Sequence, residues 1–248
     1  ITGPDESTPT RAGIPIGDLS SGLYSVIGIL SALLSKEKTG LGQNVDISLL
    51  DVQISLLTYM ATMQTLSGKD PEPIGNAHFV HVPYNTFTAQ DGFIVIAVIT
   101  DAFWYSLLDV VDIDSLRNPK FNDQSGRLAN QDFIEHELNN KLVTKPSAHW
   151  IKALNLAKVP CGPINKFSEA LADEQVLYRN MVVEVEHPDG GLVKMPGNPV
   201  KLSYTDEDSY SPPPHLGQHT REILESWAGY DSSKIEGLIS NNVVQSAD

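Results

Sequence analysis

The sequence has almost no cysteine, since Cys161 is the only one among 248 residues. This excludes an internal disulfide, and a lone thiol is typical of a reducing compartment, so we expect the cytoplasm or the mitochondrial matrix. Cys161 lies in a Val-Pro-Cys-Gly-Pro loop without a neighbouring histidine that could activate it. We therefore interpret it as a structural thiol rather than a nucleophile.

Positive charge is scarce as well, because 17 Lys and Arg residues stand against 31 Asp and Glu residues, and the formal net charge is −14. Such a chain repels polyphosphate at long range and has no basic stripe, so we expect no nucleic-acid partner. Long hydrophobic runs are also missing. The most apolar segment, residues 19–34, contains four serines and is shorter than the ~20 apolar residues of a membrane span. We expect a buried core helix there and no membrane partner.

Motifs of several enzyme classes are absent. No glycine-rich phosphate loop follows a predicted strand, and no Gly-x-Ser-x-Gly sequence indicates a serine hydrolase. His78 and His81 lie close together in the sequence, but no third ligand accompanies them at a suitable spacing, so we expect no metal site. Their location between two predicted domains leaves two interpretations open, contact with a substrate or ordinary loop histidines.

The first 70 residues predict a helix, a strand and a second helix. Apolar residues recur at helical spacing after Asp18 until Gly40 ends the pattern. Polar and apolar residues then alternate over residues 44–50, which indicates a strand, and residues 52–66 are again apolar at helical spacing. This order is typical of a parallel α/β sheet with helical crossovers.

A linker at residues 71–83, rich in Pro and Gly, separates this part from a second one of α+β type. Alternating patterns predict β-hairpins within residues 84–98 and 181–195. Residues 196–214, with three consecutive prolines, read as an irregular tether. Helices are expected at about residues 101–111, 128–142, 147–157, 167–173, 220–228 and 232–240.

Asp18 allows two interpretations that can coexist. An aspartate directly before an apolar helix is a favoured N-cap, which accepts a hydrogen bond from a backbone N–H. The same location also places a carboxylate in the positive field of the helix start, where a carboxylate nucleophile would be stabilised. The sequence pattern around Asp18 alone does not separate the two.

The segment Gly17-Asp18-Leu19-Ser20-Ser21-Gly22-Leu23-Tyr24 resembles class III (CaiB/BaiF-type) coenzyme A transferases. The resemblance extends over nearly the whole chain. It continues through residues 28–34, 38–43, 81–84, 91–95, 159–165, 181–188 and 212–220.

The resemblance implies the fold of that family, an α/β architecture with a Rossmann-like large domain and a small α+β domain, in an interlaced homodimer. Residues 1–70 would form part of the large domain and contain the catalytic aspartate. Residues 71–83 would be the linker, 84–195 the small domain, and 196–248 the return to the large domain. The family's amino-terminal half, which supplies most CoA contacts, would precede Ile1.

The resemblance also implies a reaction. Asp18 would attack the thioester of an acyl-CoA donor, carry the acyl group and then CoA, and pass CoA to a small carboxylic acid. CoA thioesters would be substrates, and no permanently bound cofactor is expected. The formyl-CoA branch carries a glycine-rich loop near His78-Phe79-Val80-His81, so we do not expect formyl or oxalyl chemistry here. Dicarboxylates such as succinate or glutarate fit better, with His78 and His81 as candidate substrate-binding residues.

Two alternatives stay open at this point. A 2-methylacyl-CoA racemase of the same fold would use Asp18 as an acid/base residue together with an upstream histidine. The residues after Asp18 are less rich in glycine than is usual for racemases, which favours the transferase. A noncatalytic fragment or scaffold is the third possibility.

Overall fold

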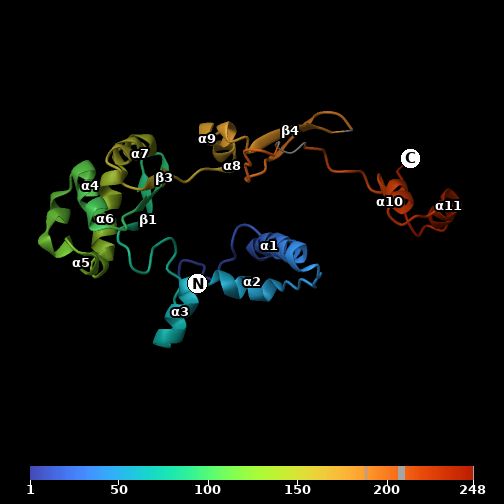
Figure 1. Cartoon of the computed structure of the whole chain (residues 1–248). Coiled ribbons are helices and arrows are strands. Elements are labelled where there is room, and N and C mark those ends of the chain that lie inside the picture. The colour runs from blue at the N-terminus through green and yellow to red at the C-terminus, as the bar shows by residue number, and fades with distance from the viewer. Residues whose placement is uncertain (188, 206–209, 248) are drawn as a thin grey trace. The chain divides into compact units, whose positions relative to one another are not determined.

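The computed structural model describes residues 1–187, 189–205 and 210–247. The chain separates into two compact units, Ile1–Ile164 and Asn165–Asp248, which Figure 1 shows in sequence colours. Pro188 of the second predicted hairpin and part of the predicted tether lie outside the described residues. The division into a large domain made from both ends of the chain and a small domain between them stays a prediction.

The first helix, α1 (Ile16–Thr39), begins two residues before Asp18. Pro15, with φ −74°, occupies the N-cap position, and the Leu19 amide donates to its carbonyl at 3.0 Å. Proline suits a helix start because its preset φ matches the helix and its missing N–H would have no partner there. The prediction that Asp18 is the N-cap is therefore wrong. Asp18 is the third residue of the first turn.

The helix ends as predicted. Gly40 takes a left-handed conformation with φ 74°, and its N–H donates to the Lys36 carbonyl at 2.8 Å. A glycine tolerates this φ because it has no Cβ. Lys36 and Lys38 lie in the last turn, where the helix dipole attracts positive charge.

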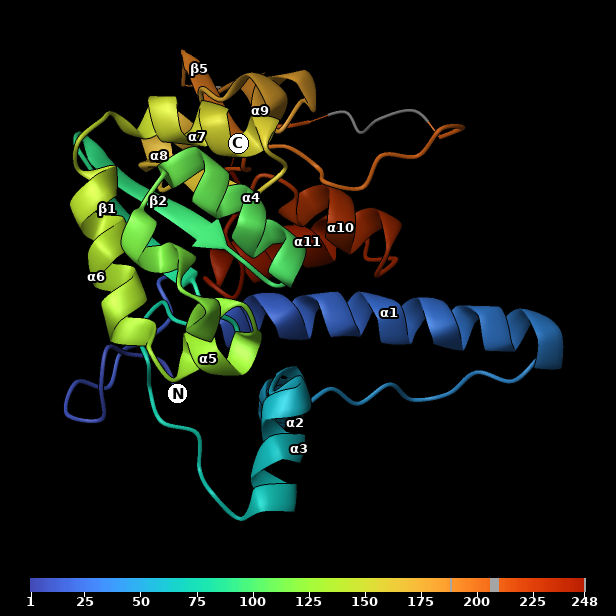
Figure 2. The same cartoon turned by 90° about the vertical axis from the view of Figure 1, so that its left-hand side faces the viewer.

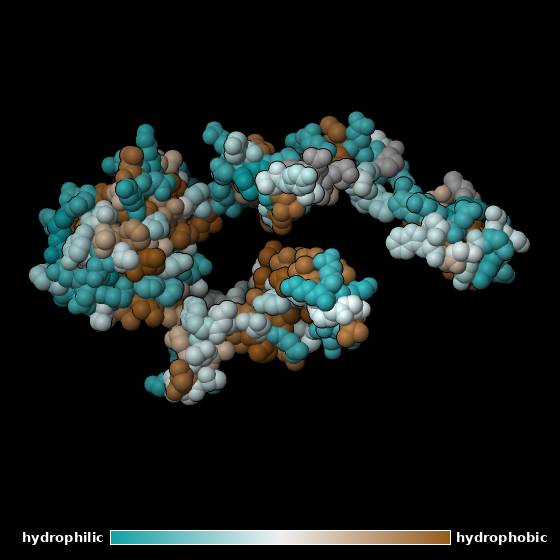
Figure 3. Space-filling model, in the orientation of Figure 1, coloured by the Kyte–Doolittle hydropathy of each residue, from teal (hydrophilic) through white to brown (hydrophobic). Residues whose placement is uncertain are grey.

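The apolar side chains of α1 are uncovered in this chain. Only Ser20 and Ser21 of this helix are buried, so the expected burial is not found among the described residues. By length and composition alone α1 could span a membrane, a test that core helices of soluble proteins also pass. Hydrophobic residues gather over α1 in Figure 3. Those at least half exposed are Leu19, Leu23, Val26, Ile27, Ile29, Leu30, Leu33 and Leu34.

Residues 41–48 run without regular structure beside α1, and the strand predicted over residues 44–50 is wrong. No described segment pairs with this stretch, and a strand needs a neighbour for its backbone hydrogen bonds. The stretch nevertheless packs closely, because a Cβ on Gly28 would lie 2.9 Å from Cγ1 of Val45. Two helices, α2 (Leu49–Leu56) and α3 (Thr58–Ser67), replace the single helical run that the sequence predicts.

A three-stranded antiparallel sheet follows the linker, in the order β1 (Tyr84–Ala89), β2 (Gly92–Ala97) and β3 (Cys161–Pro163). The first two strands confirm the predicted hairpin, with Tyr84 opposite Ala97. The third strand was not predicted, because its three residues include a glycine and a proline.

Helices α4 (Asp101–Val111), α6 (Gln131–Leu142) and α7 (Ser147–Leu156) pack around this sheet, as Figure 2 shows. The predicted helices at these places are confirmed. Trp104 and Trp150 lie at the centre of the core, and the Trp150 indole donates to the Leu142 carbonyl at 2.8 Å. Burial of each large apolar side chain stabilises the fold by about 1.5–3 kcal/mol. Three short helices connect α4 to α6: η1 (Asp114–Arg117), η2 (Pro119–Phe121) and α5 (Gln124–Leu128).

The second unit contains an antiparallel pair, β4 (Val182–Glu186) and β5 (Leu192–Pro196), which confirms the second predicted hairpin. Val183 and Val185 point to its buried side. The helices expected before and after the hairpin are confirmed. Helices α8 (Phe167–Ala170) and α10 (Thr220–Ser226) are shorter than predicted, and α11 (Ser232–Ser240) has the predicted bounds. A further short helix, α9 (Glu174–Tyr178), was not predicted.

Candidate functional site

Asp18 presents a free carboxylate at the start of α1. Its side chain is exposed and has no hydrogen-bond or ion-pair partner among the described residues. The unpaired backbone N–H groups and the positive end of the helix dipole lie in this first turn, and both attract negative charge. A carboxylate that is not engaged in a hydrogen bond or ion pair with another side chain can act as a nucleophile or as an acid/base group.

The backbone around Asp18 is held from two sides. The Ser21 hydroxyl donates to the Gly17 carbonyl at 2.7 Å, within the helix. On the other side, a Cβ on Gly17 would lie 3.2 Å from the side-chain amide carbon of Gln53 in α2. The small residues Gly17, Ser20 and Ser21 therefore let α2 approach α1 closely, and the turn that carries Asp18 is packed although the carboxylate is not.

His78 has a defined hydrogen-bonding state. Its Nδ1 accepts from the backbone amides of Val80 at 3.0 Å and His81 at 3.2 Å. Because Nδ1 is an acceptor, the neutral imidazole carries its proton on Nε2, which is left as a donor. The ring stacks on Tyr84, with centroids 5.1 Å apart.

His81 lies beside His78, with ring centroids 4.7 Å apart. Its Nδ1 is buried and has no hydrogen-bond partner among the described residues, which is rare for a buried nitrogen. Burial lowers the pKa of His78 below its ordinary value of 6.5, and the electrostatic effect of the neighbouring His81 lowers it further. The two bonds that Nδ1 accepts act in the same direction, since they favour the neutral ring. The Nε2 donor of His78 suits an anionic ligand.

Three residues that the sequence pattern did not single out hold residues 78–82, the histidine segment. Tyr84 stacks on His78, while Gln124 and Arg127 of α5 donate to backbone carbonyls on either side of His81. Arg127 is fully buried. Arginine is usually exposed and is fully buried only when it is paired. The sequence around Arg127 shows no obvious partner, so burial of this residue was not expected.

The structure does not join the predicted site residues into one cluster. No hydrogen bond or ion pair links Asp18 to His78 or His81 in the described part of the chain. Cys161 lies half-buried, where its thiol points to the Ile151 carbonyl and Asn155 Oδ1, and burial raises its pKa. This is the opposite of thiol activation. Among the described residues, no three His, Cys, Asp or Glu side chains are grouped for a metal ion.

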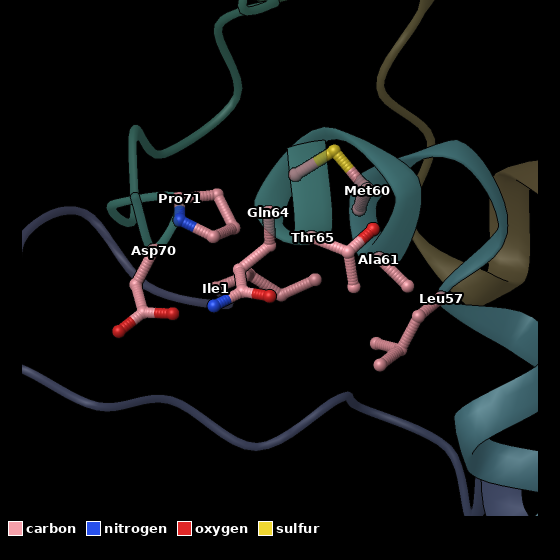
Figure 4. A pocket seen from close by; sticks show the side chains of 8 residues that line it. All are labelled: Ile1, Leu57, Met60, Ala61, Gln64, Thr65, Asp70 and Pro71. Atoms are coloured by element: carbon pink, nitrogen blue, oxygen red, sulfur yellow. The ribbon is translucent and has the colours of Figure 1, made fainter. Parts of the chain in front are cut away.

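A cavity of about 290 Å³ lies on α3 and holds neither Asp18 nor the histidines (Figure 4). Apolar groups of Leu57, Met60 and Pro71 form much of its wall, and Asp70 provides a carboxylate at its rim. Nothing in the lining is arranged for acyl transfer. Asp18 and the histidine segment therefore stay the two candidate functional places, and the described structure does not bring them together.

The chain matches CoA-transferase family III over residues 1–220. Succinyl-CoA:glutarate CoA-transferase from Homo sapiens is 34% identical over 245 residues, which are 98% of this chain and 56% of that protein. Acetyl-CoA:oxalate CoA-transferase from Acetobacter aceti is 36% identical over 92% of this chain and 58% of that protein. The chain thus spans little more than half the length of these relatives.

A solved structure gives the same result for the fold. The chain resembles a CaiB/BaiF family protein from Brucella suis with a TM-score of 0.77 and 31% identity, over 91% of this chain and 59% of that one. The match includes the mixed helix and sheet architecture that the sequence predicts. The α/β fold class is therefore confirmed.

Proposed function

Because this chain belongs to CoA-transferase family III, we propose that it transfers CoA from an acyl-CoA donor to a small carboxylic acid, through a covalent intermediate at Asp18. One observation carries the proposal. At the place where the family pattern puts the catalytic aspartate, the chain has an exposed carboxylate with no partner among the described residues, at the positive end of a 24-residue helix.

The reaction would proceed in four balanced steps. An Asp18 oxygen attacks the thioester carbonyl, the C–S bond breaks, and CoA thiolate leaves a mixed anhydride. The thiolate attacks the aspartyl carbonyl, releases the donor acid and forms an aspartyl-CoA thioester. The acceptor carboxylate attacks this thioester and again displaces CoA thiolate. The thiolate then attacks the acceptor carbonyl, which forms the new acyl-CoA and restores Asp18. The site must exclude water, because water would hydrolyse the anhydride.

We propose a dicarboxylic acid as the acceptor. The relatives named above act on glutarate and oxalate, and another, from Agrobacterium fabrum, is a succinate–glutarate CoA-transferase. One carboxylate would react while the other is bound by donors of His78 and His81. Because an oxalate enzyme is among the relatives, oxalate belongs among the candidate acceptors, although the sequence pattern argues against it.

The remaining parts of the proposal follow the family fold. The large domain would combine residues 1–70 with 196–248, and the small domain would comprise 84–195. The enzyme would be an interlaced homodimer that uses CoA thioesters as substrates and binds no permanent cofactor. Its compartment, the cytoplasm or the mitochondrial matrix, stays a prediction that rests on the lone cysteine.

The function is tested in the assembled enzyme, which we define as this chain together with the amino-terminal region that its longer relatives have. Succinyl-CoA is incubated with glutarate, oxalate, mesaconate or malate, and new acyl-CoA is measured by chromatography. We expect transfer to at least one dicarboxylate and none to matched monoacids at equal concentration. Deuterium uptake at the α-carbon of a 2-methylacyl-CoA without any acceptor would instead identify a racemase. A folded enzyme active in neither assay would favour a scaffold.

The acceptor KM should depend on pH through His78. Its lowered pKa leaves the ring neutral near pH 7, so protonation occurs only as the pH falls through that lowered value. The added positive charge then attracts the dicarboxylate, and we expect the acceptor KM to fall several-fold between about pH 7.5 and about pH 5.5. Initial rates over this range measure the effect.

The matched variants are His78→Asn and His136→Asn. The first keeps an acceptor for the backbone amides but cannot titrate, so its acceptor KM should lose the pH dependence. His136 is exposed on α6, and its variant should keep the dependence of the wild type. An unchanged profile in His78→Asn would refute the role of His78.

A further inference from the structure

The two carbonyls on either side of His81 are held by one short helix. Gln124 Nε2 donates to the carbonyl of Val80, and Arg127 Nε donates to the carbonyl of Val82 at 2.9 Å. Residues three apart in a helix lie on the same face, so both donors point to the same stretch of backbone. His81 lies between the two acceptors, and its backbone has little freedom to turn.

Arg127 is built into the small domain. Its guanidinium also donates to the Phe121 carbonyl at 3.0 Å, to Gln124 Oε1 at 3.1 Å and to Asp101 Oδ1 at 2.7 Å. The side chain is fully buried while Asp101 is 56% exposed. A buried guanidinium with several well-placed acceptors is fixed in orientation, because any movement would leave a charge without partners.

The helix that carries both donors is itself fixed. The Asp123 side chain accepts from the Gly126 amide at 2.7 Å and caps α5. A Cβ on Gly126 would lie only 1.8 Å from the Lys120 carbonyl oxygen, so α5 lies directly on the backbone of η2. Helix α5 therefore fixes the histidine segment relative to the core that α5 packs against.

We infer that Gln124 and Arg127 are positioning residues that orient His81 toward the acceptor acid. The link between His81 and the acceptor acid rests on the proposed function. The positioning of His81 by Gln124 and Arg127 does not. The Nδ1 of His81 is buried and has no partner among the described residues, so that edge of the ring faces the protein and Nε2 is the ring nitrogen that is left to meet the acceptor. The donor half-reaction at Asp18 needs neither residue.

The first experiment measures positioning without any reaction. Histidine labelled with ¹³C in the assembled enzyme gives ring resonances for His78 and His81, and these are compared between wild type, Gln124→Ala and Arg127→Lys. We expect both variants to shift the His81 resonance. Gln131→Ala and Arg117→Lys are matched controls of the same chemistry. Each loses hydrogen bonds in the same domain but touches no carbonyl of the histidine segment, and neither should shift it.

The second experiment separates the two halves of the reaction. Exchange of labelled CoA with the donor acyl-CoA requires Asp18 but no acceptor, and it should stay within about twofold of wild type in both variants. The acceptor KM should rise about threefold to tenfold in both variants, because a displaced His81 would lose up to about one hydrogen bond to the acceptor. The two control variants should keep the wild-type acceptor KM.

The outcomes are distinct. An unchanged His81 resonance in a folded Gln124→Ala variant overturns the inference. If Arg127→Lys does not fold, the result for Gln124→Ala alone decides the question. A moved resonance with an unchanged acceptor KM in an active enzyme also overturns it, since His81 would then not face the acceptor. If the wild type transfers no CoA at all, the proposed function fails, while the resonances still decide the positioning role.

Discussion

Replacing Asp18 by asparagine should lower CoA transfer by the assembled enzyme at least about a thousandfold, while the protein stays folded. The amide cannot form the mixed anhydride, so the loss is a loss of chemistry and not of substrate binding. The side chain is exposed and has no partner among the described residues. Stability should therefore fall by only about 0.3–1 kcal/mol, the contribution of a negative charge in the first turn of a helix.

The measurement combines turnover, thermal melting and trapping. Asp132→Asn is the matched control, because Asp132 is an exposed acid in the first turn of α6. It should lose a similar small amount of stability and keep turnover within about twofold. After incubation with acyl-CoA, hydroxylamine or borohydride should modify Asp18. Labelling at another residue, or full activity in Asp18→Asn, contradicts the proposed mechanism.

Replacing Gly126 by alanine should destabilise the small domain by about 3 kcal/mol, at the upper end of the usual cost of overpacking. The added Cβ would meet the Lys120 carbonyl oxygen at 1.8 Å. Because the obstacle is backbone rather than the end of a flexible side chain, α5 or η2 must move. The movement would also displace Gln124 and Arg127, so we expect the acceptor KM to rise in the same variant.

Chemical denaturation of Gly126→Ala and Gly162→Ala gives the comparison. Gly162 lies in β3 of the same domain, and a Cβ there would meet nothing within 4 Å. Its variant should stay within about 0.5 kcal/mol of wild type. Equal midpoints for the two variants would show that α5 can leave η2 at little cost.

Local signals predicted the elements between residues 84 and 157 well. Helix α4 has the predicted bounds, because its signals lie within the helix and next to it. Thr100 caps the Phe103 amide, and Trp104, Leu107, Leu108 and Val111 form one buried face. The hairpin of β1 and β2 is also specified locally, by alternation and a short turn. Elements of this kind need no information from distant parts of the chain.

Errors occurred where the outcome depends on a distant partner. Residues 44–50 alternate like a strand, yet a strand forms only beside another strand, and none of the described segments takes that place. Strand β3 shows the opposite case. Its residues have a weak strand pattern, yet they form a strand because they pair with the edge of β2. Tertiary context outweighs intrinsic preference in both cases.

The candidate site was predictable only in part. The family pattern indicated Asp18, but the sequence misplaced it by three positions within the helix start, because Pro15 occupies the cap. The sequence indicated His78 and His81, whereas the tautomer of His78 and the burial of Nδ1 of His81 depend on contacts that only the three-dimensional structure shows. Arg127 was not foreseen, since its partners are mainly backbone carbonyls, which every residue has.

The largest buried core is built from one continuous stretch of sequence, which has a consequence for synthesis on the ribosome. The residues of this core cluster all lie between Val82 and Val159, and many of its contacts join elements that are next to one another in the sequence. This domain can therefore complete its core soon after residue 164 leaves the exit tunnel. Helix α1 is synthesised before this core, and its apolar residues are still exposed in the structure, so they stay exposed to aggregation on the nascent chain until another part of the protein covers them.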